Sequence, residues 1–192
     1  MISKNLYIIA GCNGAGKTTA SYSILPTILN CKEFVNADEI AKGLSPFQPE
    51  NVSFEAGRIM LHRIEELLYK NVDFAFETTL ATKSFAQTVK KAQEKNYTVT
   101  LLFFWLNSIE LAKHRVALRV SEGGHSIPTE VIERRYQRGI KNLFELYLPL
   151  CDNVMVFDNS DKSPTLICNK TKNTAIEIAN HSLFNLLQNG IC

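Results

Sequence analysis

Residues 11–18 have the types and the spacing that bind the phosphates of a nucleotide. They match the pattern G-x-x-x-x-G-K-[ST] in full, with a short apolar run before them and a helical pattern after them. In this pattern backbone N–H groups point at phosphate oxygens, Lys17 reaches the β- and γ-phosphates, and the Thr18 hydroxyl ligates Mg²⁺. We therefore expect Mg²⁺ and ATP, with GTP as the alternative nucleotide. The predicted nucleotide-binding residues are Gly11, Cys12, Asn13, Gly14, Ala15, Gly16, Lys17, Thr18 and Thr19.

Asp38 follows a second apolar run and has the chemistry of a general base. In a phosphoryl-transfer site, a carboxylate at such a position can accept the proton of the attacking hydroxyl. A second interpretation is that Asp38 or Glu39 only caps the helix that follows, because asparagine and aspartate are good helix caps. Position alone leaves both interpretations open, and Glu39 is expected to point away from the site.

Glu77, Thr78 and Thr79 form a second polar group at the end of an apolar run. Three hydrogen-bonding side chains in succession at a strand end suit a binding site for Mg²⁺ or substrate. The alternative is a solvated loop carboxylate. We predict that this segment binds the substrate.

Arginines on two consecutive helical segments could form a lid over the nucleotide, roughly over residues 115–140. Developing negative charge on a transferred phosphoryl group needs cationic donors, and the planar guanidinium suits that role. The candidates are Arg115, Arg119, Arg134, Arg135 and Arg138. We predict catalytic roles for Arg119 and for one of Arg135 or Arg138, against the alternative of solvated surface arginines. His125, in the Gly-rich loop between the two segments, either touches the substrate or lies on the surface.

Alternating strands and helices must position these residues, which predicts an α/β P-loop NTPase. Short apolar runs predict five parallel strands at residues 6–10, 33–36, 72–76, 99–106 and 154–157, followed by a hairpin at 165–168 and 174–178. Helices are expected at 16–26, 50–69, 84–95, 108–121, 129–148 and 181–187. Apolar side chains including Phe54 are expected on the buried face of the helix at 50–69. The chain is expected to be one kinase domain over residues 1–192, with ligands beyond the carboxyl ends of the strands.

Composition narrows the functional classes. The net charge of +2 gives little support for binding to nucleic acid. The five cysteines include no C-x-x-C pair, which favours a reducing, cytoplasmic setting. The sequence has neither a signal peptide nor an apolar stretch long enough to span a membrane, so no membrane association is expected. The guanine-binding pattern N-K-x-D is absent, which favours ATP over GTP, and the lack of an Asp-Glu pair after an apolar run argues against a motor ATPase.

Taken together, the motifs resemble the zeta toxin family of P-loop kinases over roughly residues 4–160. The shared motifs are the phosphate loop G-x-N-G-A-G-K-T-T, the segments 36–41 and 76–80, and Gly123-Gly124-His125 with Pro128 ahead of Arg134-Arg135. The resemblance implies an adenylate-kinase-like core with a small helical lid. It also implies that Asp38 is the base, that Glu77 binds substrate, and that Lys17 and the lid arginines stabilise the transition state. Relatives phosphorylate UDP-N-acetylglucosamine and are neutralised by an antitoxin protein. In contrast to the family pattern, residues 123–127 contain no arginine before the lid proline.

Three functions follow from these observations. The leading hypothesis is a kinase that phosphorylates a hydroxyl of a small molecule, either UDP-N-acetylglucosamine or another nucleotide sugar or metabolite. The second is a nucleotide-dependent switch that binds a partner through the lid without phosphorylating small molecules. The third is a nucleic-acid end kinase, supported only by Lys90-Lys91 and the lid arginines.

Overall fold

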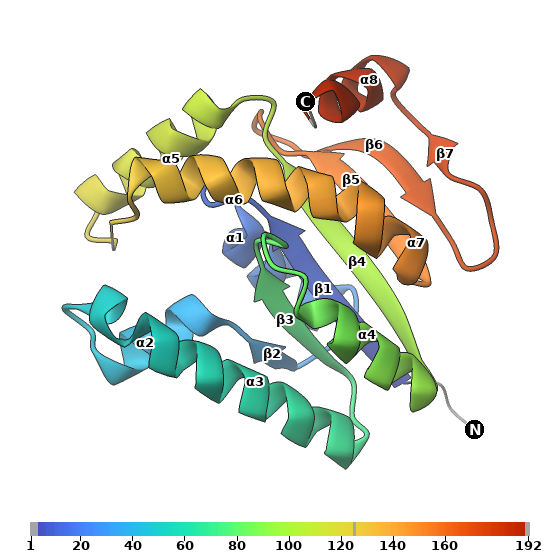
Figure 1. Cartoon of the computed structure of the whole chain (residues 1–192), viewed down its shortest axis with the longest axis horizontal. Coiled ribbons are helices and arrows are strands. Elements are labelled where there is room, and N and C mark those ends of the chain that lie inside the picture. The colour runs from blue at the N-terminus through green and yellow to red at the C-terminus, as the bar shows by residue number, and fades with distance from the viewer. Residues whose placement is uncertain (1–3, 125, 191–192) are drawn as a thin grey trace.

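The computed structural model describes residues 4–124 and 126–190, and its centre is a seven-stranded sheet in the order β2-β3-β1-β4-β5-β6-β7 (Figure 1). The strands from β2 to β5 are parallel, and β6 and β7 are antiparallel additions at one edge. The bounds are β1 Lys4–Gly11, β2 Glu33–Val35, β3 Phe74–Thr78, β4 Tyr97–Trp105, β5 Asn153–Asp158, β6 Thr165–Lys170 and β7 Glu177–Ile178. The predicted parallel core is therefore confirmed, and the predicted hairpin extends the same sheet.

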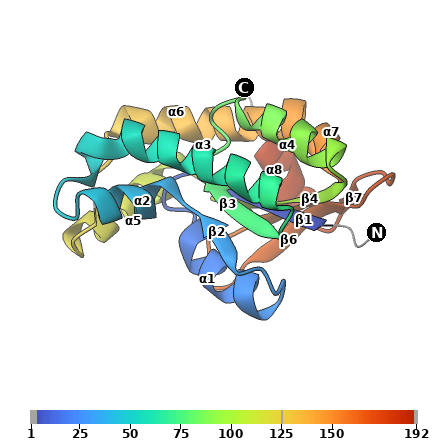
Figure 2. The ribbon, with the colours of Figure 1, turned by 90° about the horizontal axis from the view of Figure 1, so that it is seen from below.

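Helices cover both faces of the sheet. Figure 2 shows α3, α4 and α6 on one face and α1 on the other. The bounds are α1 Lys17–Thr27, α2 Ala37–Leu44, η1 Pro49–Val52, α3 Ser53–Lys70, α4 Phe85–Glu94, α5 Ile109–Ser121, α6 Thr129–Asn142, η2 Leu143–Tyr147, α7 Leu148–Leu150 and α8 His181–Asn189. In the described part of the chain, no helix combines the length and the apolarity that a membrane span requires.

The strand order brings the polar segments to one edge of the sheet. In the parallel register Ile9 of β1 lies beside Glu77 of β3, and Val35 of β2 lies beside Phe76. Asn36 therefore leaves the sheet next to Glu77. Ligands of open parallel sheets bind beyond the carboxyl ends of the strands.

The centre of the sheet is buried on both faces, as its apolar strands predict. Ile8, Phe76 and Phe103 have essentially no exposed surface. Parallel strands that are covered on both sides read as continuous apolar runs rather than alternating ones, which is why these strands were recognisable in the sequence. The buried apolar residues hold the strands in place, and the polar site residues lie at the carboxyl ends of these strands.

Two local expectations were wrong. The predicted helix at 50–69 begins as the 3₁₀ turn η1, and Phe54, expected on its buried face, is 81% exposed. The third strand runs from Phe74 to Thr78 rather than from residue 72 to 76, so Glu77 lies inside the strand. Pairing with β1 continues to Thr78, and this tertiary contact sets the strand end in place of local polarity.

Candidate active site

The phosphate loop has the conformation that its glycines allow. Gly11 has φ +143° and Gly16 has φ +77°, values that favour glycine. A Cβ atom on Gly11 would lie 2.1 Å from the Phe104 carbonyl oxygen, so no side chain fits there. The loop ends at α1, which begins at Lys17 with Gly16 as the N-cap residue. The start of a helix after a glycine-rich loop is a general anion-binding arrangement.

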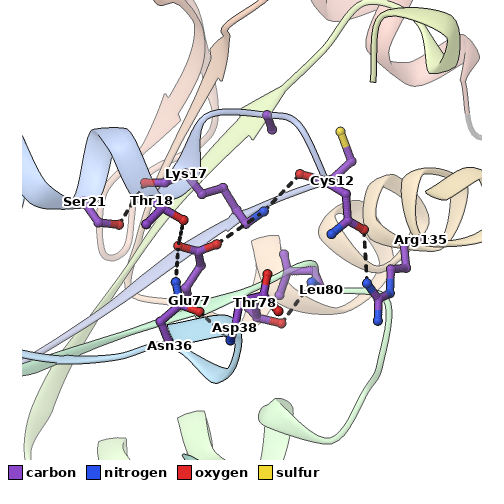
Figure 3. A network of polar contacts seen from close by, with 12 residues as sticks. Cys12, Lys17, Thr18, Ser21, Asn36, Asp38, Glu77, Thr78, Leu80 and Arg135 are labelled. Carbon is purple, nitrogen blue, oxygen red and sulfur yellow. Dashed lines mark hydrogen bonds and ion pairs between the residues drawn. The ribbon is translucent and has the colours of Figure 1, made fainter. Parts of the chain in front are cut away.

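Lys17 and Thr18 both contact Glu77 (Figure 3). Lys17 Nζ lies 3.5 Å from Glu77 Oε1 and donates a hydrogen bond of 3.0 Å to the Cys12 carbonyl oxygen. Thr18 Oγ1 donates to Glu77 Oε2 at 2.8 Å. The side chains of Lys17 and Glu77 are only 7% and 8% exposed. The cation and the hydroxyl of the phosphate loop thus share one buried carboxylate.

Asn36 is a site residue that the sequence motif contained but whose role was not predicted. Its Nδ2 donates to Glu77 Oε2 at 3.0 Å, and its Oδ1 accepts from the backbone N–H groups of Asp38 and Glu39 at 2.8 and 3.4 Å. Asn36 is buried and is the N-cap of α2. One side chain therefore fixes both Glu77 and the helix turn that carries Asp38. The signal was present, because asparagine ahead of a helical pattern is among the preferred caps.

Asp38 does not cap α2, because Asn36 does. The capping interpretation is therefore wrong for both Asp38 and Glu39. Glu39 instead pairs with Lys42 at 2.8 Å. The partly exposed Asp38 lines a cavity of about 370 Å³ between α2 and the N-terminal part of α6. Its carboxylate is available to a molecule in that cavity.

Arg135 extends from α6 to the phosphate loop. Its Nη1 donates to Asn13 Oδ1 at 3.2 Å, and the residue lines the same cavity as Asp38 (Figure 3). Burial lowers the pKa of the Arg135 guanidinium, Asp38 acts against that shift, and the neighbouring Arg134 adds to it. The guanidinium keeps its charge because its ordinary pKa is far above neutrality. Arg135 therefore connects the cavity that Asp38 lines to the phosphate loop.

Several predicted residues lie elsewhere or act locally. Within the described residues, Arg119 does not line the Asp38 cavity, and it packs closely against Gly124 of the lid loop. Thr78 Oγ1 accepts a hydrogen bond from the Leu80 N–H, so its hydroxyl stabilises the turn after β3. The Thr79 carbonyl lies so close to α6 that only a glycine fits opposite, at Gly139.

The remaining predicted positions flank the phosphate loop and the lid. Thr19 is exposed on α1. Cys12 is buried. Burial raises the pKa of the Cys12 thiol to about 11. His125 lies outside the described residues.

A second set of contacts missed from the sequence joins the phosphate loop to the segment after β5. Asn159 Nδ2 donates to the Ala15 carbonyl oxygen at 2.8 Å. Arg115 donates to the carbonyl oxygens of Asn159 and Ser160 at 2.8 and 2.6 Å. Arg115 therefore ties α5 to the segment after β5, and Asn159 ties that segment to the phosphate loop.

The donor atoms around Thr18 fit a magnesium ion. Mg²⁺ prefers hard oxygen ligands and is usually bound through one or two carboxylates together with substrate phosphates. The Thr18 hydroxyl and the Glu77 carboxylate already meet at 2.8 Å beside Lys17. The residues present are thus of the types that Mg²⁺ bound to a nucleotide requires.

Solved structures share this fold at low sequence identity. A chain of the AvrRxo1-ORF1:AvrRxo1-ORF2 crystal structure aligns with 96% of this chain at 17% identity and a TM-score of 0.78, and this chain spans 63% of that chain. A related structure of that complex contains ATP. A structure of the PezAT chromosomal toxin–antitoxin system of Streptococcus pneumoniae aligns over 99% of this chain and 85% of that chain, at 16% identity and a TM-score of 0.69. A gluconokinase of Sinorhizobium meliloti aligns over 98% and 91%, at 12% identity and a TM-score of 0.52. The architecture is therefore that of P-loop kinases.

Sequence comparison identifies the family. A Haemophilus influenzae protein, described as uncharacterized, is 27% identical over 143 residues, which are 71% of this chain and 100% of that protein. The family model described as zeta toxin matches residues 2–170, which include the phosphate loop, Asp38, Glu77 and Arg135. The chain therefore belongs to the zeta toxin family.

Proposed function

We propose that this protein is an ATP- and Mg²⁺-dependent kinase that transfers the γ-phosphate to a hydroxyl of a small molecule. Its family and its fold support a nucleotide-dependent kinase. The observation that carries the finer proposal is that Asp38 and Arg135 line one cavity, while Arg135 also donates to Asn13 of the phosphate loop. A base, and a cation that reaches the phosphate site, are the parts that phosphoryl transfer to an alcohol needs.

The donor side of the proposed site consists of the phosphate loop with Lys17, Thr18 and Glu77. Lys17 would exchange its contact with Glu77 for the donor phosphates. Thr18 and Glu77 would hold Mg²⁺, which supplies neutralisation of the phosphate charge when bound. This assignment places Glu77 on the metal side of the site, whereas the family resemblance alone suggested a contact with the acceptor. Its contact with Thr18 supports the metal side.

On the acceptor side, Asp38 is proposed as the general base. The acceptor oxygen forms a bond to the γ-phosphorus as the bond from that phosphorus to the leaving ADP oxygen breaks. The hydroxyl proton passes to the Asp38 carboxylate and then to solvent. Arg135 donates to Asn13 of the loop and lines the same cavity as Asp38, and it would stabilise the charge that spreads over the transferred phosphoryl oxygens. We assign Arg119 a weaker, lid-closing part, because it packs against the lid loop.

Family membership suggests both acceptors and partners for testing. UDP-N-acetylglucosamine is one candidate acceptor, and other nucleotide sugars or metabolites are the alternatives. ATP is proposed over GTP because the sequence lacks a guanine-binding motif and because a structural relative was solved with ATP. The likeness to a toxin–antitoxin structure supports a search for an antitoxin partner.

Kinetics of an Asp38→Asn variant test the proposed base. We expect kcat on the best acceptor to fall roughly 10²- to 10⁴-fold, because asparagine cannot take the proton. ATP binding should persist, since the phosphate loop is untouched. Glu39→Gln is the matched control, because Glu39 is the adjacent carboxylate and pairs with Lys42 on the surface. Wild-type activity in Asp38→Asn would remove Asp38 from the mechanism.

A further inference from the structure

The cavity lined by Asp38 has two chemically different walls. One wall comes from α2, η1 and the start of α3 and carries Asp38, Glu50 and Ser53. The other comes from the end of the lid loop and from α6 and carries Arg134 and Arg135. The volume of about 370 Å³ lies near the small end of the range for ligand sites, about 300–1,000 Å³. An acceptor held here is correspondingly small.

The two arginines of the cavity differ in their partners. Arg135 reaches Asn13 and is thus directed to the phosphate loop. Arg134 makes no ion pair within 4.0 Å and no hydrogen bond with any residue in the described ranges 4–124 and 126–190. The positive charge of Arg134 also disfavours the charge of Arg135. Burial has the larger effect in lowering the pKa of Arg135, and the charge of Arg134 adds to it. An anion bound at Arg134 would relieve that repulsion.

The opposite wall suits hydroxyl groups. Asp38 shares the cavity with Arg135, which reaches the phosphate loop, and would receive the reacting hydroxyl. Glu50 and Ser53 are exposed and line the same wall, so they offer a carboxylate and a hydroxyl to the other hydroxyl groups of an acceptor. Once donor phosphates engage Arg135, Arg134 is the cation of the cavity that remains for the acceptor.

We propose that the acceptor is a small polyhydroxy compound with a phosphate or carboxylate group that Arg134 binds, while its reacting hydroxyl lies at Asp38. This inference rests on the proposed kinase function and narrows its substrate. Arginine binds both anions through a planar pair of N–H donors. The cavity size favours a sugar monophosphate or a sugar acid. The diphosphate of a nucleotide sugar offers the same chemistry, but it would leave the nucleoside outside the cavity.

Transfer assays with matched acceptors test this proposal. The full chain is supplied with MgATP and with glucose, glucose 6-phosphate, gluconate or UDP-N-acetylglucosamine. We expect kcat/KM for an anionic sugar to exceed that for glucose by about 10- to 100-fold, as a charge-assisted bidentate contact implies. Arg134→Ala should raise KM for the anionic sugar by a similar factor with kcat nearly kept, and Arg134→Lys should recover part of it. Lys141→Ala, which removes an exposed cation of the same helix, should change neither constant.

Binding measurements separate failure of this inference from failure of the kinase proposal. The anionic sugars are titrated calorimetrically into Asp38→Asn protein, with and without Arg134→Ala. Binding that depends on Arg134 but without any transfer by wild-type protein would overturn the kinase and keep the anion site. Equal use of glucose and its anionic forms, or a KM unaffected by Arg134→Ala, would overturn the anion site. Transfer only to UDP-N-acetylglucosamine supports the site if Arg134→Ala raises its KM, and overturns it otherwise.

Discussion

Replacing Glu77 by glutamine tests the ion pair that holds the phosphate loop before a nucleotide binds. The Glu77 carboxylate lies 3.5 Å from Lys17 Nζ, and both side chains are almost fully buried. Removal of one member of a buried ion pair typically costs ~3–5 kcal/mol of unfolding free energy, because the remaining charge stays buried without an opposite charge beside it. Glutamine keeps an oxygen that can accept from Thr18, and Lys17 keeps the Cys12 carbonyl. We therefore expect the lower end of that range, about 3 kcal/mol.

ATP should return part of this loss, because its phosphates offer Lys17 a new anionic partner. In EDTA, where Mg²⁺ is removed, we expect saturating ATP to recover about 1.4 kcal/mol, which corresponds to roughly tenfold tighter ATP binding by Glu77→Gln than by wild type. The result would show that Glu77 and the nucleotide compete for Lys17.

The assay is urea unfolding with and without ATP, followed by the fluorescence of Trp105, the only tryptophan of the chain. Glu66→Gln is the control. Glu66, like Glu77, takes part in ion pairs, here with Arg63 and Lys70, but it lies on the surface. Its replacement should therefore leave the unfolding midpoint close to wild type. A Glu77→Gln protein as stable as wild type, or one whose deficit ATP leaves unchanged, would refute the reasoning.

Three further variants or reactions probe separate contacts. Asn36→Ser keeps an N-cap for α2 but removes the amide that donates to Glu77. We therefore expect kcat to fall roughly tenfold with little change in the melting temperature. A large fall in the melting temperature together with the loss of kcat would contradict a positioning role. Tyr136→Phe removes the hydroxyl that accepts from the buried Trp105 N–H at 3.0 Å. Urea titrations should then show an unfolding free energy lower by about 2 kcal/mol. An unchanged unfolding midpoint would show that water replaces the hydroxyl. Burial raises the pKa of the Cys12 thiol to about 11, so only about one thiol in a thousand is ionised at pH 8. Peptide mapping should therefore find Cys12 alkylated by iodoacetamide only in denaturant. Rapid alkylation of the native protein would contradict that burial.

The parts of the fold that were predictable from sequence depend on local signals. The phosphate loop and the buried runs of the parallel strands each follow from residue types over a few positions, and the structure contains both. The strand order also places Asp38 and Glu77 at the same edge of the sheet as the loop. The prediction that these segments converge follows from the geometry of parallel sheets.

The rest depends on contacts between distant segments. Phe54 was expected on the buried face of α3, yet that face runs through Ala56, Met60 and Ile64, and Phe54 lies on the opposite side of the helix. The end of β3 is set by pairing with β1 rather than by the polarity of Glu77. The link from Asn36 to Glu77 joins residues 41 positions apart, so no local pattern contains it.

Phosphate transfer from γ-labelled ATP is the most direct test of the kinase proposal. The wild-type chain is incubated with Mg²⁺, labelled ATP and a pool of sugar phosphates, sugar acids and nucleotide sugars. Lys17→Ala protein serves as the blank, because it lacks the cation that reaches the donor phosphates. We predict a labelled small-molecule product that the wild-type protein forms and the Lys17→Ala protein does not. No labelled product from a wild-type protein that still binds ATP would contradict the kinase and favour a nucleotide-dependent binding role.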